Sequence, residues 1–470
     1  MSGPAKGGAR PGDRPGRRGA DGGRADGGRG GPRQGGGRSG GSRSGGSGSG
    51  GGFGGSRSAG GGRGSAGGRS GREPEGLPPA ELALVEALRF LQPADLVLRR
   101  FFAAHREMGR RDRAELAELV FDVLRNRRLY ASLAQSAGGS LPARMLALSR
   151  ERARIRTEGL APEIRLSLPG WLYQRLAARM PKAELESLGA ALLKPAPLDL
   201  RANLLKGDRD AALAALRAEG IDCEPSVVAP QGIRVAGKPA LERTRAFNEG
   251  LVEVQDCGSQ LIALLCAPRR GQTVVDFCAG AGGKTLALAA LLRGTGQVFA
   301  CDVSVGRLQR LRPRLARSGA SNVQPYGIDS EHDPKLGRLA GRADVVLVDA
   351  PCSGTGTLRR NPDLKWRMDD SGVAELAVRQ GSILAAAARL VRPGGALVYA
   401  TCSLLDEEND AVRRAFEAAH PDWTVEPAGA VLSRQGVPAS AVAPDAECLE
   451  LRPDRHDTDA FYAVRWTRPA

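Results

Sequence analysis

The sequence contains no apolar stretch of the roughly 20 residues that a helix needs to cross a membrane. It also has no apolar core behind its N-terminus of the kind that signal peptides carry. We therefore expect a cytoplasmic protein, in a compartment that keeps thiols reduced. None of its eight cysteines belongs to a paired C-x-x-C motif. The sequence thus argues against membrane proteins, structural disulfides and zinc modules, and it predicts no metal site.

Residues 1–76 are almost devoid of apolar side chains. The first 72 residues hold half of the 64 glycines, and fourteen Lys and Arg stand against three Asp. Such a segment cannot bury enough surface to offset its chain entropy, so we expect a disordered, basic Gly/Arg-rich tail. Its charge suits salt-sensitive contact with nucleic acid, although a solubilising role explains the composition equally well.

Residues 77–150 show the apolar period of helices. Many arginines lie between apolar residues in this segment. The apolar residues recur at spacings of three and four, at Leu84, Val85, Leu88, Leu116, Leu119, Val120, Val123 and Leu124. The pattern predicts a small all-helical domain with a basic face. That face either contacts RNA or is an ordinary solvated helix surface.

Residues 151–247 predict linker helices and a small α+β subdomain. Short strands are expected at 199–204, 221–228 and 232–235, with a helix at 208–219 that ends at a glycine. Short strands around an amphipathic helix are compatible with an RNA-facing sheet.

Residues 248–470 alternate between strands and helices. The expected strands are 273–277, 297–302, 323–328, 344–348, 396–401 and 461–466, and the expected helices are 285–292, 307–315 and 373–391. A Pro-Gly-Gly turn, 393–395, should precede the strand at 396–401. This alternation predicts an α/β, doubly wound, Rossmann-like domain with a mostly parallel sheet, whose ligands bind beyond the carboxyl ends of the strands.

A glycine-rich turn follows the first of these strands, in the sequence Asp-Phe-Cys-Ala-Gly-Ala-Gly-Gly-Lys-Thr of residues 276–285. It is not a phosphate-binding P-loop, because it lacks the first glycine of the Gly-x-x-x-x-Gly-Lys-Thr motif. Asp302 ends the next strand, where a carboxylate can accept hydrogen bonds from ribose hydroxyls, and Asp329 ends the third. This ordered set predicts a nucleoside ligand without pyrophosphate.

Two cysteines end the fourth and fifth strands, Cys352 in Asp-Ala-Pro-Cys and Cys402 in Thr-Cys-Ser. A thiol at such a turn can have a lowered pKa, because nearby helix N-termini favour the thiolate. A thiolate that adds to carbon 6 of cytosine makes carbon 5 reactive, so the pair suits covalent catalysis on a base. Either cysteine could attack on these grounds alone.

The longer motifs around these cysteines resemble a known family. Three segments are similar to motifs of the Nop/Sun family of RNA cytosine-C5 methyltransferases. They are Asp-Ala-Pro-Cys-Ser-Gly-Thr-Gly at 349–356, Arg-Arg-Asn-Pro-Asp-Leu-Lys-Trp at 359–366 and Thr-Cys-Ser at 401–403. The bacterial RsmB type, which modifies 16S ribosomal RNA, is the closest in motif. The resemblance extends to 253–260 and 456–462, and more weakly to a NusB-like helical domain around 91–129.

The resemblance implies an S-adenosylmethionine-dependent enzyme that acts on ribosomal RNA as a monomer. Cys402 matches the nucleophile, and Cys352 matches the cysteine that assists release of the methylated RNA. The positions implied to bind S-adenosylmethionine are Cys278, Ala279, Gly280, Ala281, Gly282, Gly283, Lys284, Asp302, Asp329 and Asp349. The positions implied to lie near the RNA are Lys284, Asp349, Arg359, Arg360 and Lys365. Four other cysteines are expected to pack in the interior: Cys257, Cys266, Cys278 and Cys301.

The chain departs from the family pattern at two positions. Gly280-Ala281 stands where the family has Ala-Pro, which should loosen the cofactor loop, and Ala460 replaces a glycine. Two other functions remain open on the sequence: methylation of transfer RNA or DNA, where Cys352 would attack in a DNA-type enzyme, and a non-catalytic RNA-binding assembly factor. The two cysteines and the strand-end aspartates argue against the last.

Overall fold

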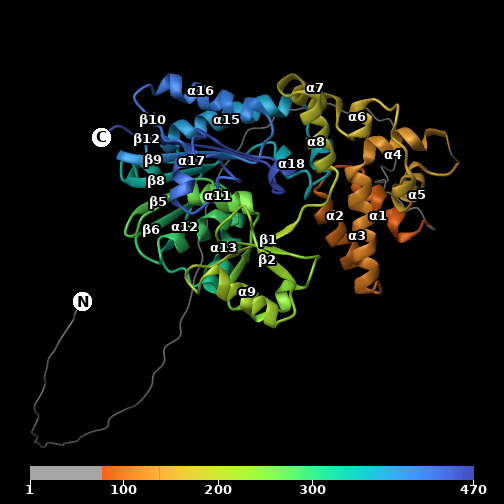
Figure 1. Cartoon of the computed structure of the whole chain (residues 1–470), viewed down its shortest axis with the longest axis horizontal. Helices are drawn as coiled ribbons and strands as arrows, with labels where there is room; N and C mark the ends of the chain where they lie inside the picture. Colours follow the sequence, from red (N-terminus) through yellow and green to blue (C-terminus); the bar gives the residue numbers. More distant parts are fainter. Residues whose placement is uncertain (1–76, 137) are drawn as a thin grey trace, which may run out of the picture. The chain divides into compact units, whose positions relative to one another are not determined.

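The computed structural model describes residues 77–136 and 138–470 (Figure 1). The predicted tail, 1–76, lies outside the described residues. The N-terminal part is helical, as predicted. Its helices are α1 (Pro79–Ala87), α2 (Ala94–Ala104), α3 (Arg110–Arg125), α4 (Arg127–Leu133), α5 (Leu141–Arg150), α6 (Pro162–Arg165), α7 (Gly170–Arg179) and α8 (Lys182–Leu192). Short 3-10 helices follow α4, as η1 (Ala134–Ser136), and α5, as η2 (Arg152–Arg154).

The apolar stripe of α3 explains why the first helices pack together. Leu116, Val120 and Val123 are buried and lie in one core with Leu84 of α1 and Tyr130 of α4. Arg110 and Arg111 at the start of α3 are exposed, whereas Arg125 at its end is buried. Helices α7 and α8 contribute to another core, which also contains Leu358, Leu404 and Leu405 of the catalytic region.

A small antiparallel sheet follows. Its strands are β1 (Leu198–Ala202), β2 (Cys223–Pro225), β3 (Gly232–Val235) and β4 (Val252–Val254), in the order β2-β3-β1-β4, with α9 (Arg209–Ala218), η3 (Leu241–Arg243) and α10 (Arg245–Asn248). The strand predicted at 221–228 is much shorter than expected. The pattern also missed β4, which lies beyond residue 247 yet pairs with β1.

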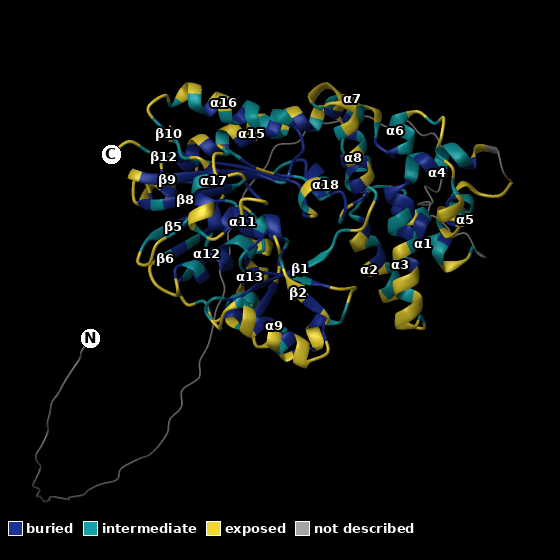
Figure 2. Ribbon diagram, viewed as in Figure 1, coloured by how far each residue is buried: buried dark blue, intermediate teal, exposed yellow. Residues whose placement is uncertain are grey.

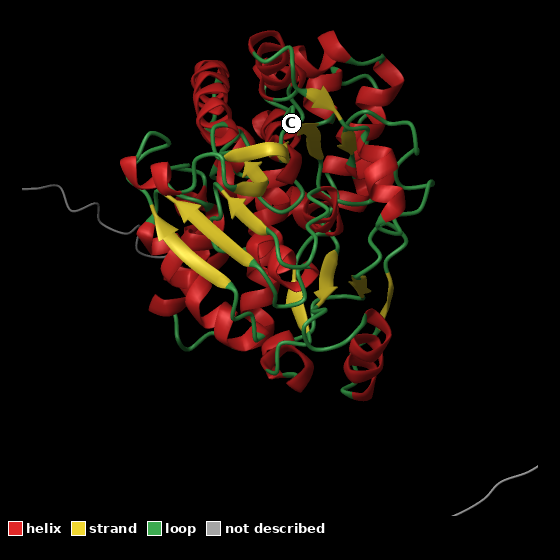
Figure 3. Ribbon diagram, turned by 90° about the vertical axis from the view of Figure 1, so that its left-hand side faces the viewer, coloured by secondary structure: helices red, strands yellow, loops and turns green. Residues whose placement is uncertain are grey.

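The second sheet has eight strands in the order β10-β12-β9-β8-β5-β6-β7, with β11 beside β12. The strands are β5 (Thr273–Asp276), β6 (Gln297–Asp302), β7 (Val323–Gly327), β8 (Ala343–Asp349), β9 (Val391–Thr401), β10 (Thr424–Val425), β11 (Leu449–Leu451) and β12 (Phe461–Thr467). Strands β5 to β9 pair in parallel, and β10 to β12 pair antiparallel. Figure 3 shows these strands side by side, with helices around them.

Helices cover both faces of this sheet (Figure 1). The helices of this part of the chain are α11 (Cys257–Leu265), α12 (Gly283–Leu291), α13 (Val305–Ser318), α14 (Leu364–Arg367), α15 (Asp370–Ala388), α16 (Asp410–Ala419), α17 (Ala428–Arg434) and α18 (Pro453–His456), with the 3-10 helices η4 (Pro334–Arg338), η5 (Thr355–Thr357) and η6 (Asp406–Glu408). Helices α11, α12 and α17 pack on one face, and α15 and α16 pack on the other.

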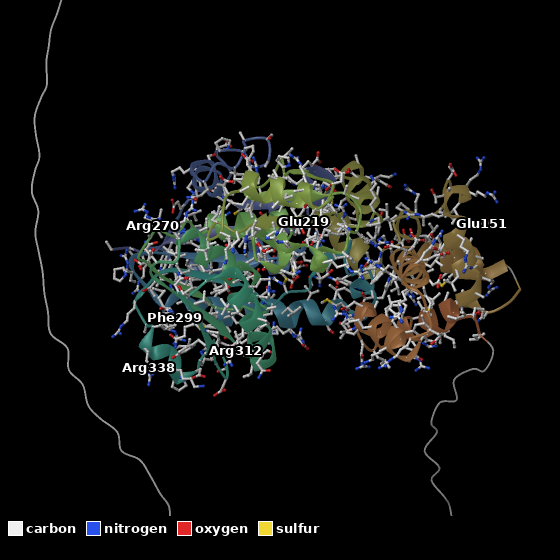
Figure 4. The ribbon with its side chains drawn as sticks, turned by 90° about the horizontal axis from the view of Figure 1, so that it is seen from below. Glu151, Glu219, Arg270, Phe299, Arg312 and Arg338 are labelled. Carbon is white, nitrogen blue, oxygen red and sulfur yellow. The ribbon has the colours of Figure 1, made fainter. Side chains whose placement is uncertain are left out.

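The alternation of side chains along β8 explains this layering. Leu347 packs with α11 and α12, whereas Val346 and Val348 pack with α15. The central strands are therefore buried on both sides, as Figure 2 shows in dark blue. Charged side chains lie at the surface, among them Arg312 of α13 and Arg338 (Figure 4). In the described part of the chain, no helix combines the length and apolarity that a membrane span needs.

Strand β9 begins earlier than the sequence predicts. The sequence places the start of this strand at residue 396, after Pro-Gly-Gly, but β9 already begins at Val391 and runs through residues 393–395. Gly394 adopts φ +68, and the register with β8 shifts between Ala343 and Val345, so the strand accommodates the glycines as an irregularity. The carboxyl end of β9 still delivers Thr401 and Cys402 to the same edge of the sheet.

Candidate active site

A cavity of about 550 Å³ opens at the carboxyl ends of the parallel strands. Asp276 of β5, Asp302 of β6, Asp349 of β8 and Cys402 after β9 all line it. The chain passes from β5 outward to β6 and β7 and then returns to β8 on the other side of β5. Ligands bind at such a switch point, where the two following loops diverge and leave a crevice.

A glycine-rich loop forms one wall of the cavity. It leaves β5 and enters α12 at Gly282, whose φ of +86 favours glycine. A Cβ at Gly282 would lie 2.2 Å from Leu311 Cδ1, so this residue is also needed for close packing. A Cβ at Gly280 would meet nothing within 4 Å. The loop therefore combines a tightly packed base with an open edge at Gly280, which leaves room for a ligand.

Asp302 fixes this loop and lines the cavity. The side chain is buried, and its Oδ2 accepts a hydrogen bond from the Gly280 N–H at 2.8 Å. Its Oδ1 accepts one from the Ser304 N–H at 2.7 Å and lies 3.3 Å from the Arg307 guanidinium. A carboxylate held in this way is a rigid acceptor for hydroxyl groups at the cavity wall.

Asp276 lies deeper in the same wall. Burial raises its pKa to about 7, although Thr285 donates a hydrogen bond to its Oδ2 at 2.7 Å. Its Oδ1 has no hydrogen-bond partner among the described residues. An unpaired buried oxygen costs free energy and is expected where a bound ligand provides the partner.

Lys284 and Asp349 form an ion pair beside the cysteines. The Lys284 Nζ lies 2.7 Å from Asp349 Oδ2 and 5.7 Å from the centre of the Phe461 ring. Burial favours the neutral amine, but the charge and hydrogen bond of Asp349, together with Cys402, leave the pKa of Lys284 raised. The site thus holds a permanent cation near the Cys402 thiol, which stabilises a thiolate by Coulomb attraction.

The two thiols lie side by side: Cys352 Sγ and Cys402 Sγ are 3.4 Å apart. The hydrogen bond with Cys402 and burial raise the pKa of Cys352 well above the usual value for cysteine. The expectation that a strand-end thiol has a lowered pKa is therefore wrong for Cys352. The contact with Cys402 and burial thus favour the thiol form of Cys352.

Comparison with known proteins connects this geometry to a family. Residues 263–467 match the family model described as 16S rRNA methyltransferase RsmB/F, and residues 168–242 match that of its ferredoxin-like domain. The chain is 37% identical over 297 residues to a probable ribosomal RNA small subunit methyltransferase B of Synechocystis. It is 34% identical over 316 residues to ribosomal RNA small subunit methyltransferase B of Salmonella typhi.

These alignments cover 63% and 67% of this chain, and 66% and 70% of the two relatives. The chain therefore aligns with about two thirds of each curated relative. The chain belongs to the RsmB/F family of 16S rRNA methyltransferases. The crystal structure of PH0851 has a similar fold, with a TM-score of 0.68 and 25% identity, over 83% of this chain and 99% of that one.

The structure brings most of the predicted RsmB/F site residues together. Those that line the cavity are Cys278, Ala279, Gly280, Ala281, Gly283, Lys284, Asp302, Asp349, Cys352 and Cys402. Gly282 packs against Leu311 instead. Cys257, Cys266 and Cys301 are buried in the interior, as predicted, whereas Cys278 is only partly buried and lines the cavity.

Asp329 does not line the cavity. Its side chain is 92% exposed, and its nearest charged partner is Lys335, at 3.7 Å. Ile328 and Glu331, on either side of it, line the cavity instead. The prediction that Asp329 contributes a cofactor contact is therefore corrected: β7 ends one residue early, and its last turn directs this carboxylate to solvent.

The three basic residues predicted to contact RNA are engaged within the protein. Lys365 is buried, and its Nζ donates to the carbonyls of Arg125 and Ser167 at 2.9 and 2.7 Å. Arg359 is buried and pairs with Asp457, and Arg360 pairs with Asp256 and Asp459. All three side chains also donate hydrogen bonds to backbone carbonyls of preceding segments, and their contact with RNA stays a prediction.

Other cavity residues were missed by the sequence analysis. These are Gln255, which directly follows β4, Arg314 of α13 and Arg379 of α15. Gln255 accepts a hydrogen bond from the buried Arg201 at 2.6 Å, and Arg314 donates to the Ala281 carbonyl. Gln255 lies within the family-like segment 253–260, which was its only sequence signal. The others approach the loop from elements distant in sequence.

Replacing Asp302 by Ala is expected to weaken binding of S-adenosylmethionine by about 1.5–3 kcal/mol, because hydrogen bonds to a charged acceptor are lost. Isothermal titration of the purified protein measures this effect. Asp329→Ala is the matched control, since that carboxylate is exposed and outside the cavity. A larger loss in Asp329→Ala than in Asp302→Ala would contradict the corrected assignment.

Replacing Lys365 by Ala is expected to reduce stability by about 1–3 kcal/mol, because two buried carbonyls lose their donor. Burial lowers the pKa of Lys365 to about 7. The unfolded chain therefore holds this proton more tightly, and the contribution of Lys365 makes stability rise with pH between about 7 and 10.5. Urea unfolding at several pH values should show a flatter profile in the variant. RNA affinity should match that of Lys238→Ala, a surface control.

Proposed function

We propose that this protein methylates carbon 5 of a cytosine in 16S ribosomal RNA, using S-adenosylmethionine and a covalent adduct at Cys402. The observation that carries the proposal is the pair of thiols 3.4 Å apart, at the mouth of a nucleoside-sized cavity and beside the Lys284–Asp349 ion pair. A methyltransferase that acts on a nitrogen or a ribose hydroxyl has no use for two thiols in this place.

The residues of the cavity fit S-adenosylmethionine. Its volume of about 550 Å³ lies within the range of small-molecule sites. Asp302 would hold the ribose hydroxyls, and the open edge at Gly280 leaves space for the ligand beside the loop. The unpaired Oδ1 of Asp276 offers a further acceptor. The bound cofactor supplies an electrophilic methyl group on its sulfonium.

Cys402 starts the reaction. After loss of its proton, its sulfur bonds to carbon 6 of the cytosine, and the electron pair of the 5,6 double bond moves toward carbon 5. Carbon 5 thereby becomes nucleophilic enough to accept the methyl group. The Lys284 ammonium, fixed by Asp349, stabilises the thiolate and the charge that develops on the base.

Cys352 ends the reaction. Its thiol is held protonated chiefly by the hydrogen bond with Cys402, and by burial and the charge of Cys402. Once the sulfur of Cys402 is bonded to carbon, that anion is gone, and Cys352 ionises more readily by losing its proton to solvent. Cys352 then removes the proton from carbon 5, the 5,6 double bond re-forms, and the electron pair of the C6–S bond returns to Cys402 as the thiolate leaves.

The remaining domains have roles in RNA binding in this proposal. We assign residues 77–150 to a NusB-like RNA-binding domain, 151–247 to linker helices and the small α+β subdomain, and 248–470 to a Rossmann-like catalytic domain. The basic residues of 1–76 add affinity for RNA by neutralising phosphates. The enzyme acts as a monomer in the cytoplasm, where its substrate is found.

Methylation in vitro tests this function. The purified protein is incubated with labelled S-adenosylmethionine and, separately, with 16S ribosomal RNA, transfer RNA or duplex DNA. We expect label in 16S RNA, recovered as 5-methylcytosine after nuclease digestion, and bisulfite sequencing should place it at one position. Label in transfer RNA or DNA alone, or recovery of another methylated nucleoside, would contradict the proposal.

A further inference from the structure

A buried carboxylate lies behind the two cysteines. Glu408 of η6 is fully buried, and its Oε1 accepts hydrogen bonds from the Ser353 N–H at 2.7 Å and from Gln380 Nε2 at 3.0 Å. Its Oε2 accepts one from Ser403 Oγ at 2.5 Å. Ser353 directly follows Cys352, and Ser403 directly follows Cys402. One side chain therefore holds both of the turns that carry the thiols.

Neighbouring groups complete this clamp. Gln380 Nε2 also donates to the carbonyl of Pro351, which precedes Cys352, at 3.0 Å. The hydroxyl of Tyr399 donates to the Glu408 backbone carbonyl at 2.6 Å, and the hydroxyls of Ser353 and Ser403 lie 3.2 Å apart. The separation of the two sulfur atoms is thus set by a buried polar network that crosses from one turn to the other.

The charge of Glu408 has no cationic partner. Among residues 77–136 and 138–470, no Lys, Arg or His forms an ion pair with it, so hydrogen bonds alone compensate its burial. Burying a carboxylate without a cationic partner costs free energy. Costs of this kind are typical of sites where a charge serves the chemistry rather than the stability of the fold.

We propose that Glu408 is a positioning residue of the reaction: it clamps the turns of Cys352 and Cys402, and its charge makes the surroundings of the two thiols unequal. The proposal rests on the function proposed above. In the resting enzyme, the carboxylate opposes a second anion at Cys352. The cysteine that must wait for the adduct therefore stays a thiol until Cys402 has attacked.

The surrounding charges agree with this role. The ionisable groups that face the thiols are Lys284 of α12, Asp349 of β8, Tyr399 of β9 and Glu408 of η6. After the hydrogen bond with Cys402, burial and the charge of Cys402, Glu408 is the next cause that raises the pKa of Cys352. Lys284 pairs with Asp349, which leaves Glu408 as the uncompensated charge behind Cys352.

The test measures thiol reactivity and turnover separately in Glu408→Gln and Glu408→Ala. The glutamine keeps the clamp but removes the charge, whereas the alanine removes both. Initial rates of iodoacetamide alkylation at pH 8 are measured by mass spectrometry of the peptides that contain Cys352 and Cys402. In Glu408→Gln, alkylation of Cys352 should be about tenfold faster, which corresponds to a pKa about one unit lower. Glu407→Gln is the matched control, because that neighbouring carboxylate is partly exposed and pairs with Arg175.

Turnover on 16S RNA should fall by about 10²-fold in Glu408→Ala, with an unchanged Kd for S-adenosylmethionine, because the reacting atoms are misplaced. In Glu408→Gln, turnover should be partly rescued, and the pH profile of kcat should move to lower pH. Unchanged alkylation and an unchanged pH profile in Glu408→Gln would overturn the proposal, even if Glu408→Ala does not fold. Because alkylation needs no RNA, it decides the role of Glu408 even if the wild-type protein methylates another substrate.

Discussion

Replacing Cys402 by Ala is expected to reduce methyl transfer by about four orders of magnitude or more, the scale seen when a covalent nucleophile is removed. Binding of S-adenosylmethionine should remain nearly intact, because the thiol acts on the base, and Asp302 and the glycine-rich loop are unchanged. Transfer of a labelled methyl group to RNA measures the first quantity, and isothermal titration measures the second.

Cys448→Ser is the matched control for this prediction. Cys448 is also a partly exposed, free cysteine, but it lies outside the cavity, where it contacts Arg413 and Tyr462. Its serine variant should retain wild-type turnover. Normal turnover in Cys402→Ala would refute the assignment of the nucleophile, and equal loss in both variants would point to a general effect on folding.

Replacing Cys352 by Ala is expected to stop the reaction after attack. Cys402 can still bond to carbon 6 and the methyl group can still be transferred. The thiol of Cys352, which lies 3.4 Å from the Cys402 sulfur, is then missing and cannot remove the proton from carbon 5. A covalent protein–RNA complex should therefore accumulate and survive denaturing electrophoresis as a band of reduced mobility. Turnover should fall in parallel, because each enzyme molecule reacts once.

The double variant separates the two roles. Cys402→Ala and the double variant should give no covalent band, because attack comes first. A band in Cys402→Ala alone would reverse the roles of the two cysteines. If no variant gives a band, release does not depend on a second cysteine.

The sequence predicted the central sheet well, because its strands carry their own signal. A strand buried on both faces is a continuous run of β-branched and apolar residues, and β6 was placed to the residue. The position of the site could be predicted from the same strand pattern, because parallel strands present their carboxyl ends at one edge of the sheet. Asp276, Asp302, Asp349 and Cys402 could therefore be grouped before their distances were known.

Features that depend on tertiary contacts could not be read from the chain. Lys365 lies in a motif that resembles an RNA-contacting segment, yet it is buried and bonds the carbonyls of Arg125 and Ser167, 240 and 198 positions earlier in sequence. The raised pKa of Cys352 arises from a neighbour 50 residues away. β4 was missed because three residues carry no periodic signal, and only pairing with β1 defines them as a strand.

The central claim is that the sulfur of Cys402 bonds to the cytosine, and the trapped complex tests it most directly. The covalent complex of Cys352→Ala with 16S RNA is digested with nuclease and protease, and the cross-linked peptide is sequenced by mass spectrometry. The account predicts a methylated cytidine nucleotide attached to the peptide that contains Cys402. Attachment to any other cysteine, or to a base other than cytosine, would contradict it.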